Sequence, residues 1–410
     1  MPNTGPNHAS EHPLRDEHRP ASGGKSVVIL GGGQLGAMLA EAAGHMGIRA
    51  IGVSASETDP IRRWCDHHVV ADPTDPAMAA RVARGGCVVT VETESIPPEV
   101  LEAAEAAGCR AAPAAGAQRV VRDRRLEKTF LSENQLPVGP FRIVESAGAM
   151  AEAFAQLAVS APARPAGAGT VVAKTARGGY DGRGQRWLKS AEQARTAWEA
   201  LGSQPLVLEQ AVPFVAEASV IVARGAGGQS STLPMFRNEH RNGILFQTVS
   251  PTGFSPAVEQ RAMAAAERVA QRLGVVGLLA VEMFVLADGQ VLINELAARP
   301  HNSGHLSLRA CTLSQFELHL AAIMDLPLPP VNLLQPAVMT NLLGDLWNRG
   351  APDLKLILQD SGANVQLYGK SPRPGRKMGH MIHLGHTAEE AQAAANAAMA
   401  RLRAAAGIAA

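Results

Sequence analysis

Two glutamates in the second half of the chain are the residues best placed for chemistry. Glu282 lies in the apolar segment VEMFV, and Glu295 lies in VLINEL, beyond a turn at Asp288-Gly289. If the two segments pair as an antiparallel hairpin, the carboxylates lie close together and repel each other. A hard cation relieves this repulsion, and Mg²⁺ prefers one or two carboxylates together with phosphate oxygens. The pattern predicts a magnesium site, and two exposed acidic residues are the alternative.

A polar segment, ARPHNSGH, follows the second glutamate directly. It places four polar side chains beside the predicted metal site: Arg299, His301, Asn302 and His305. A guanidinium group offers a planar fork of donors that suits a small oxyanion. We therefore predict an oxyanion site here, and a polar linker into a helix that begins near Leu306 is the alternative.

A glycine-rich segment, VVAKTARGGYDGRGQ, could surround the phosphates of a nucleotide. Lys174 ends a predicted strand in it, and four glycines fall within residues 178–184. Flexible backbone amides and a lysine on a rigid strand suit phosphate groups. The pattern GxxxxGK[ST] of a Walker A loop is absent, so the loop is of another kind, or is a plain hairpin loop.

A second glycine-rich segment, GGGQLG, spans residues 31–36 at a predicted strand-to-helix turn. Such a turn can bring backbone amides close to an anion, or can serve only the packing of a helix on a sheet. Binding of NAD is disfavoured, because Ser54 and Ser56 stand where dinucleotide-binding sheets usually carry an acidic residue.

Two glutamates lie within a further segment, LVLEQAVPFVAEASV. Glu209 ends one predicted strand and Glu217 opens the next. The backbone between them could bind adenine and Glu217 a ribose hydroxyl, whereas solvated glutamates are the alternative.

A basic cluster lies in YGKSPRPGRKMGH, where Lys370, Arg376 and Lys377 fall within eight residues of a chain that has seven lysines. The cluster suits a dianionic phosphate, unless it is a solvated turn. We predict that it reaches across to the N-terminal domain near Gln34.

Three folding units must position these residues. Residues 25–122 alternate buried strands with Ala-rich helices, which predicts a small doubly wound parallel sheet. Residues 123–325 alternate short strands with helices, including a long helix over 256–273, which predicts an α+β region. After the proline-rich LPLPPVNLLQP, residues 335–410 predict a small domain of short strands and a C-terminal helix.

The composition excludes several classes of protein. With 410 residues, 46% hydrophobic and 18% charged, the chain predicts a folded protein of about three domains. A net charge of +1 gives no electrostatic footprint for nucleic acid or an anionic membrane. The four cysteines show no CxxC spacing, which predicts reduced thiols. Residues 1–24 predict a disordered tail without a signal sequence, and no apolar run predicts a membrane span, so we expect a cytoplasmic protein.

Taken in order, GGGQLG, AKTARGGYDGRGQ, EQAVPF, VE…NELAARPHNSGH and YGKSPRPGRKMGH resemble the motifs of 5-(carboxyamino)imidazole ribonucleotide synthetases, a family of the ATP-grasp superfamily. The segment NEHRNGIL, residues 238–245, is similar to the family's NxHRxGIL. The resemblance covers about residues 25–386. It implies an α/β and α+β, three-domain ATP-grasp architecture, with a Rossmann-like (pre-ATP-grasp) N-terminal domain, a two-lobed ATP-grasp region and a small C-terminal domain.

The resemblance also implies a ligase reaction of purine biosynthesis. ATP phosphorylates bicarbonate to carboxyphosphate, and the exocyclic amine of 5-aminoimidazole ribonucleotide takes the carboxyl group, with release of ADP and phosphate. It further implies ATP and Mg²⁺ as cofactors, a homodimer, and a downstream mutase that receives the product.

Carried over residue by residue, the resemblance implies four groups of site residues. ATP binding is assigned to Arg124, Lys174, Gly179, Tyr180, Asp181, Gly182, Arg183, Gly184, Gln185, Glu209, Gln210, Ala211, Val212, Glu217, His240, Asn294 and Glu295. Metal binding is assigned to Glu282 and Glu295. Catalysis with the bicarbonate-derived group is assigned to Arg299, His301, Asn302 and Tyr180. Ribonucleotide binding is assigned to Gln34, Leu35, Glu92, Lys370, Arg376 and Lys377.

Two features depart from the family pattern, and three alternatives remain. The stretch TVETESIP lacks the aromatic residue of the family's more typical TxExEx(V/I)P, and the tail 1–24 is extra. A related ATP-grasp formate-dependent glycinamide ribonucleotide formyltransferase shares the loop and hairpin layout. A dinucleotide-binding oxidoreductase is disfavoured by the missing acidic strand end, and an inactive scaffold by the intact carboxylates and Lys174.

Overall fold

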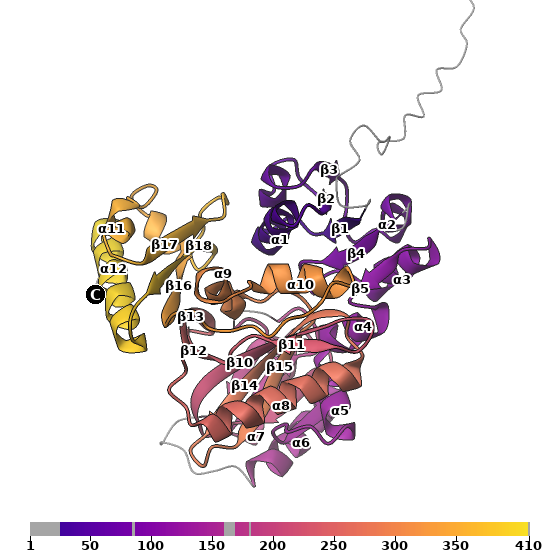
Figure 1. The fold of residues 1–410 in the computed structure, drawn as a ribbon. Coiled ribbons are helices and arrows are strands. Elements are labelled where there is room, and N and C mark those ends of the chain that lie inside the picture. Colours follow the sequence, from indigo (N-terminus) through magenta and orange to yellow (C-terminus); the bar gives the residue numbers. More distant parts are fainter. Residues whose placement is uncertain (1–24, 84–86, 160–168, 180–181, 409–410) are drawn as a thin grey trace, which may run out of the picture.

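The computed structural model of the protein (Figure 1) describes four ranges of residues: 25–83, 87–159, 169–179 and 182–408. The tail predicted over 1–24, and the predicted site residues Tyr180 and Asp181, lie outside the described residues. Among the described residues, no helix is both long and apolar enough to cross a membrane.

The N-terminal domain is built on a five-stranded parallel sheet of order β3-β2-β1-β4-β5. Its strands are β1 (Ser26–Leu30), β2 (Arg49–Ser54), β3 (His67–Val70), β4 (Val88–Val91) and β5 (Arg110–Ala112). Its helices are α1 (Gln34–His45), η1 (Pro60–Arg63), α2 (Pro76–Val82), α3 (Pro98–Ala106) and α4 (Ala115–Arg122). Val27 and Ile29 of β1 pack against α1, whereas Val28 and Leu30 pack against α2 and α3. Burial on both faces explains the continuous apolar run of β1 and confirms the predicted doubly wound sheet.

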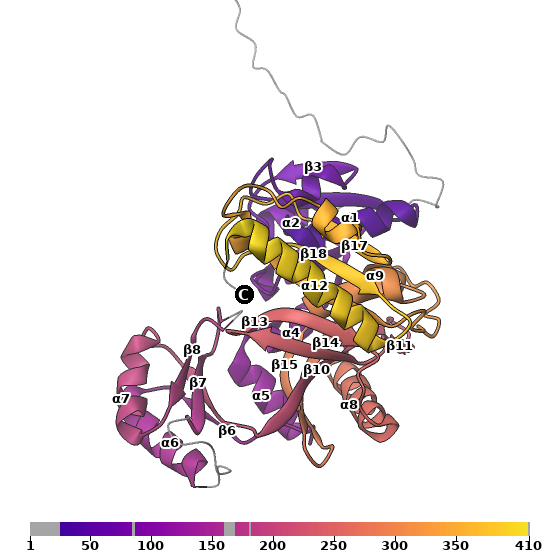
Figure 2. The ribbon, with the colours of Figure 1, turned by 90° about the vertical axis from the view of Figure 1, so that its left-hand side faces the viewer.

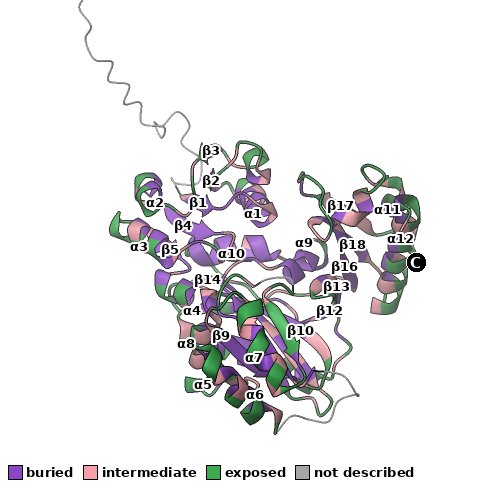
Figure 3. Ribbon diagram, turned by 180° about the vertical axis from the view of Figure 1, so that it is seen from behind, coloured by how far each residue is buried: buried purple, intermediate pink, exposed green. Residues whose placement is uncertain are grey.

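A four-stranded antiparallel sheet of order β6-β9-β7-β8 forms the small lobe of the central region. Its strands are β6 (Phe141–Val144), β7 (Val171–Thr175), β8 (Gln185–Leu188) and β9 (Leu206–Gln210). The helices of this segment are α5 (Arg124–Glu133), η2 (Ala147–Ala149), α6 (Met150–Ala158) and α7 (Ala191–Ala200). Phe154, Leu157 and Ala197 join α6 and α7 to the sheet, while the outer sides of these helices are exposed (Figure 3). The lobe stands beside the larger sheet (Figure 2).

A nine-stranded sheet forms the large lobe, in the order β15-β14-β10-β12-β13-β16-β18-β17 with β11 paired to β10. Its central-region strands are β10 (Phe214–Arg224), β11 (Ser230–Thr232), β12 (Phe236–Arg241), β13 (Ile244–Ser250), β14 (Gly277–Leu286) and β15 (Val291–Ala297). Helix α8 (Pro256–Leu273) covers one face, with Ala266 and Val269 in the same core as Val220 and Leu279. The long helix predicted over 256–273 is therefore confirmed.

Helix α10 (Gln315–Ile323) joins the N-terminal domain to the large lobe and is buried along its whole length (Figure 3). Phe316 packs with Leu39 of α1, whereas Leu318 packs with Ile221 of β10. Two short helices precede it, η3 (Asn302–Leu306) and α9 (Ser307–Ala310). Because apolar residues surround α10 on both sides, the two domains share a continuous apolar contact.

The C-terminal part adds three strands to the large sheet rather than building a separate sheet. These are β16 (Ala337–Leu343), β17 (Ala363–Leu367) and β18 (Lys377–Leu384), and the helices are η4 (Gly344–Trp347), α11 (Lys355–Leu358) and α12 (Ala388–Ala406). Strand β13 pairs with β16, with Gln247 opposite Thr340 and Val249 opposite Val338. The sequence predicted the short strands and the final helix, but not this continuity.

Candidate active site

A cleft of about 1200 Å³ lies between the N-terminal domain, the two lobes and the C-terminal strands. Every described residue that the family resemblance assigned to the site lines this cleft. Residues from α1, β7, β9, β14 and β15, from the segment after β4 and from the segment before β18 therefore face one common space, although they are distant in sequence.

The two predicted metal ligands are opposite each other in the hairpin, and a β-bulge determines this register. Near the turn Met283 pairs with Ile293, but beyond it Glu282 pairs with Glu295, so Asn294 is the extra residue. A bulge of this kind re-aims side chains. Here Asn294 and Glu295 both line the cleft, as does Glu282.

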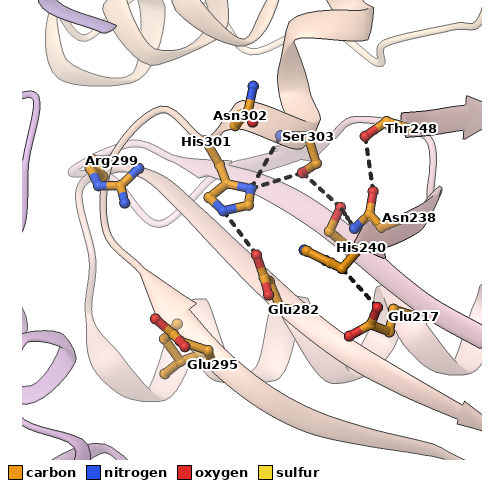
Figure 4. A network of polar contacts seen from close by, with 12 residues as sticks. Glu217, Asn238, His240, Thr248, Glu282, Glu295, Arg299, His301, Asn302 and Ser303 are labelled. Atoms are coloured by element: carbon orange, nitrogen blue, oxygen red, sulfur yellow. Dashed lines mark hydrogen bonds and ion pairs between the residues drawn. The ribbon is translucent and has the colours of Figure 1, made fainter. Parts of the chain in front are cut away.

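His301 holds one of these carboxylates. Its Nε2 lies 2.9 Å from Glu282 Oε1 (Figure 4). Burial raises the pKa of Glu282, but the hydrogen bond from His301 and the charges of His240 and Lys377 outweigh it and lower the pKa to about 2. The group is an anion at neutral pH, as a metal ligand must be.

A buried cluster of charges occupies the small-lobe end of the cleft. Lys174 Nζ lies 3.0 Å and Lys128 Nζ 3.3 Å from Glu209 Oε2. Burial raises the pKa of Glu209, but the charges of Lys128, Lys174 and Arg124 lower it to about 2. Lys174 also donates to Asn294 Oδ1 at 3.3 Å, which connects the small lobe to the bulge.

Arg124 bridges the two lobes and retains unused donors. Its Nη2 lies 3.1 Å from Glu295 Oε2, and its Nη1 lies 3.9 Å from Glu209. Burial lowers the pKa of Arg124, but the charges of Glu295, Glu127 and Glu209 raise it. Its Nε and Nη1 are buried and have no hydrogen-bond partner, which is costly unless an acceptor binds there. An anionic ligand in the cleft would supply that acceptor.

Two further predicted ATP ligands bond to each other. His240 Nδ1 lies 2.7 Å from Glu217 Oε2, on the neighbouring strands β12 and β10. Burial lowers the pKa of His240, but Glu217 and Glu282 raise it above the usual value. Phe214 and Phe284 stack beside them with ring centroids 4.6 Å apart, and both line the cleft. This wall offers an apolar surface next to a carboxylate.

The glycine-rich loop closes the same end of the cleft. Gly179, Gly182, Arg183, Gly184 and Gln185 line it. Gly184 adopts a φ of +68°, and an added Cβ would lie 2.5 Å from Thr175 Oγ1, so glycine is required there. The two remaining predicted loop residues, Tyr180 and Asp181, lie outside the described residues.

Two of the predicted oxyanion residues, Arg299 and Asn302, each bond to a residue in another part of the chain. Arg299 forms an ion pair with Glu94 of the N-terminal domain, and burial leaves its Nε without a partner. Asn302 exchanges two hydrogen bonds with Asn341 of β16, at 3.0 and 2.7 Å, and points away from Glu282 (Figure 4). Each pair joins the large lobe to another part of the chain.

His305 does not reach the cleft, although the sequence pattern placed it beside the metal site. It is fully buried, and its Nδ1 lies 3.0 Å from Gln315 Nε2. Burial holds the pKa of His305 well below its usual value.

The N-terminal domain presents a carboxylate to the far end of the cleft. Glu92 accepts hydrogen bonds from the backbone amides of Gly33, at 2.8 Å, and Gly36, at 3.0 Å. The amides of GGGQLG thus bind an internal carboxylate, which differs from the predicted phosphate cradle. A Cβ at Gly33 would lie 2.7 Å from Glu92, so this contact explains that glycine.

The basic cluster meets the N-terminal domain at this end. Lys370 Nζ donates to Gln34 Oε1, which is the approach that the sequence predicted. Burial lowers the pKa of Lys370 to about 8, with Glu92 acting in the opposite direction. Leu35, Arg376 and Lys377 line the cleft here.

Two charged residues at the site, the buried Lys128 and the half-buried Glu94, were missed in the sequence. Lys128 is 2% exposed and also donates to the carbonyl of Asn294 at 2.8 Å. The sequence did contain an indication that Lys128 has a specific role, because lysine is rare in this chain. Glu94, the partner of Arg299, follows Glu92 by two residues at the carboxyl end of a parallel strand, where ligand sites gather.

The fold and the cleft together define an ATP-grasp enzyme. The sequence matches the ribonucleotide synthetase preATP-grasp domain over residues 24–122, the ATP-grasp domain over 129–316 and the phosphoribosylaminoimidazole carboxylase C-terminal domain over 337–394. The chain is 36% identical to N5-carboxyaminoimidazole ribonucleotide synthase of Bacillus subtilis over 374 residues, which are 90% of this chain and 93% of that protein.

Solved structures agree. A crystal structure of an ADP complex of N5-carboxyaminoimidazole ribonucleotide synthetase is similar with a TM-score of 0.84 and 36% identity, covering 93% of this chain and 98% of that one. The Aspergillus clavatus enzyme in complex with ADP and 5-aminoimidazole ribonucleotide has a TM-score of 0.82 and 29% identity, covering 92% and 98%. The chain belongs to the N5-carboxyaminoimidazole ribonucleotide synthase family.

Proposed function

We propose that this protein carboxylates 5-aminoimidazole ribonucleotide, using ATP and bicarbonate and releasing ADP and phosphate. Bicarbonate oxygen attacks the γ-phosphorus of ATP to give carboxyphosphate and ADP. The exocyclic amine then attacks the carboxyl carbon, phosphate leaves, and the amine loses a proton. The product is N5-carboxyaminoimidazole ribonucleotide, as the name of the family states.

ATP occupies the small-lobe end of the cleft in this proposal. Lys174, the loop amides and the unused donors of Arg124 face its phosphates, and Glu217 faces its ribose. The predicted ATP ligands Gln210, Ala211 and Val212 lie at the end of β9 and directly after it, at the junction of the two lobes, where their backbone can bind adenine.

Mg²⁺ is the metal that this carboxylate pair fits. Glu282 and Glu295 are opposed and lie among other charges, and among the described residues no group of three or more candidate metal ligands occurs. Mg²⁺ prefers two carboxylate ligands, with phosphate oxygens and water in the remaining coordination positions. The bound metal would neutralise charge on the transferring phosphoryl group.

Bicarbonate and the ribonucleotide occupy the rest of the cleft. Arg299 and His301 face the bicarbonate-derived group, and Asn302 retains one amide N–H beyond its bonds to Asn341. Glu92 and Gln34 face the aminoimidazole ribonucleotide, whose phosphate meets Lys370, Arg376 and Lys377. Tyr180, which lies outside the described residues, is a further catalytic candidate on the family resemblance.

One observation carries the proposal: opposed carboxylates, a partly buried arginine and histidine, and a basic cluster share a single cleft. The test is ADP release in a mixture of ATP, Mg²⁺, bicarbonate and 5-aminoimidazole ribonucleotide, with each component omitted in turn. Release should depend on Mg²⁺ and rise strongly with the ribonucleotide, because carboxyphosphate must be protected from water. Equal stimulation by formate with glycinamide ribonucleotide would contradict the assignment.

Three finer points rest on the family resemblance. We propose that the enzyme acts in the cytoplasm, as a homodimer, and passes its product to a mutase. Size-exclusion chromatography with light scattering tests the dimer, since a monomer at micromolar concentration would contradict it.

A further inference from the structure

Four buried polar side chains lie behind the floor of the cleft and connect to His301 through hydrogen bonds (Figure 4). We call them the buried polar chain: Thr248, Asn238, Ser219 and Ser303. Three of them are 0% exposed and the fourth, Asn238, is 7% exposed. None of the four lines the cleft among the described residues, so they act on a ligand only through another side chain.

The hydrogen bonds of the chain all run in one direction. Thr248 Oγ1 donates to Asn238 Oδ1 at 3.1 Å, and Asn238 Nδ2 donates to Ser219 Oγ at 3.0 Å. Ser219 Oγ donates in turn to Ser303 Oγ at 2.8 Å. The hydroxyl proton of Ser303 is then left for His301 Nδ1, which lies 2.9 Å away.

This direction determines where the imidazole of His301 carries its proton. The backbone N–H of Ser303 can only donate, and it points at His301 Nδ1 at 3.3 Å. With two donors directed at it, Nδ1 accepts, and the ring proton resides on Nε2. Nε2 lies 2.9 Å from Glu282 Oε1, so the last donor of the series faces that carboxylate.

Backbone contacts hold the residues on both sides of this hydrogen-bond series, Ser219 with Glu282 and His301 with Gln315. Ser219 and Glu282 are directly paired in β10 and β14, so their side chains lie on the same face of the sheet. Gln315 accepts from His301 N and donates to His301 O, each at 2.8 Å, which holds the main chain of the histidine. The ring can still rotate, so its orientation depends on what bonds to Nδ1.

Hydroxyl and amide groups are expensive to bury, and an apolar core of the same shape would fold at least as well. A fully satisfied polar network instead specifies one arrangement of its members. Some residues do not contact a metal but hold one of its ligands in the correct orientation. Removing such a residue typically lowers metal affinity or activity about 10- to 100-fold. The buried polar chain has the connectivity of such a support.

We propose that the buried polar chain holds His301 in the Nε2–H tautomer and thereby orients Glu282 toward the cleft. Its four members are positioning residues, and the inference rests on the proposed function of Glu282 as a Mg²⁺ ligand.

The test combines the histidine tautomer with steady-state kinetics. The ring nitrogens of ¹⁵N-histidine-labelled protein are observed by NMR without metal or nucleotide, and the His301 signals are those lost in His301→Gln. We expect Nε2 protonated and Nδ1 bare in the unmodified protein. Ser219→Ala interrupts the chain and should give a mixture of tautomers and a roughly tenfold lower kcat. The KM for ATP should change less than twofold.

A second variant and a matched control complete the test. Thr248→Val removes the first donor with little change in shape, and should shift the tautomer in the same direction. Thr340→Val is the control: Thr340 is also 0% exposed in the same sheet, where it accepts from Gln247 at 3.1 Å, but lies outside the chain. It should leave tautomer and kcat unchanged.

Three results would overturn the inference: a proton on Nδ1 of His301 in the unmodified protein, unchanged tautomers in both chain variants, or equal effects of Thr248→Val and Thr340→Val. The carboxylation activity of the unmodified protein is measured in parallel. If it is present while the tautomer is wrong, the inference fails and the proposed function stands.

Discussion

Glu282 and Glu295 are opposite each other only because Asn294 is inserted as a bulge between two stretches of regular pairing. The turn itself contains three residues, with Gly289 at a φ of +79°, and its register would place Asn294 opposite Glu282. The bulge shifts the register by one residue and directs both Asn294 and Glu295 to the cleft. The turn and the bulge together therefore determine which side chains of the hairpin face the cleft.

Replacing Glu295 by Gln should nearly abolish turnover with a smaller loss of nucleotide binding. The charge that holds Mg²⁺ against the transferring phosphoryl group is removed, while the shape of the side chain is kept. Single-turnover ADP formation and nucleotide titration measure the two effects. Glu239→Gln, on the exposed part of β12, is the control. Wild-type activity of Glu295→Gln at limiting Mg²⁺ would remove this residue from the metal site.

Lys174→Met should weaken ATP binding, because a buried positive charge at the phosphates is lost while the methylene stem can still pack. A loss of about 1.5–3 kcal/mol is expected for a contact to a charged group. Isothermal titration calorimetry measures the affinity. The exposed Lys189, in the same lobe, supplies the control variant Lys189→Met. Equal ATP affinity in both variants would contradict the assignment.

Lys128→Met should lower stability more than Lys174→Met. Lys128 is 2% exposed, and the change removes a charge next to Glu209 and the hydrogen bond to the carbonyl of Asn294. Glu209 keeps Lys174 as a partner, so we expect a decrease of about 2 kcal/mol in the free energy of unfolding. Urea unfolding measures it. A decrease no larger than that of Lys174→Met would contradict the structural role.

The KM for 5-aminoimidazole ribonucleotide should rise severalfold as the pH increases from 7 to 9. Burial lowers the pKa of Lys370 to about 8, so this lysine is charged below that pH and neutral above it. The phosphate of the substrate stays dianionic over the range, since its second pKa is about 6. Lys370→Arg keeps its charge and should flatten the profile. A rise of the same size in that variant would exclude Lys370 as its cause.

Arg376→Ala should raise the KM for the ribonucleotide at least severalfold and leave the KM for ATP nearly unchanged. Arg376 lines the cleft next to Lys370, and loss of a charge-assisted contact costs about 1.5–3 kcal/mol. Steady-state kinetics with each substrate varied gives both constants. If the ATP constant rises instead, the basic cluster belongs to the nucleotide end of the cleft.

Much of the fold could be predicted from the sequence, because many of its elements are determined by patterns of residues that are close together in the sequence. The apolar run of β1, the helix from Pro256 to Leu273 and the turn at Asp288-Gly289 each report on their neighbours in sequence. The pairing of β13 with β16 could not be predicted this way. It joins residues about ninety positions apart, and neither strand carries a signal for its partner.

The site residues divide in the same way, into those that local sequence patterns could predict and those that only the fold brings together. Charged residues in glycine-rich segments were visible as candidates, and the contact of Lys370 with Gln34 was predicted. The carboxylate bound by the GGGQLG amides was not, because Glu92 follows a different strand, β4, and only the fold brings it there. His305 looked like a site residue by its spacing, yet the η3 turn directs it into the core.

The continuity of β13 with β16 has a mechanical consequence. Backbone hydrogen bonds join the strands from Glu282 on β14 and Glu295 on β15 to β18, which begins at Lys377. Lys377, Glu282 and Glu295 therefore belong to one rigid body, in which the sheet holds their backbones at a fixed separation. Helix α10 couples the N-terminal domain to that body through apolar packing on both of its sides.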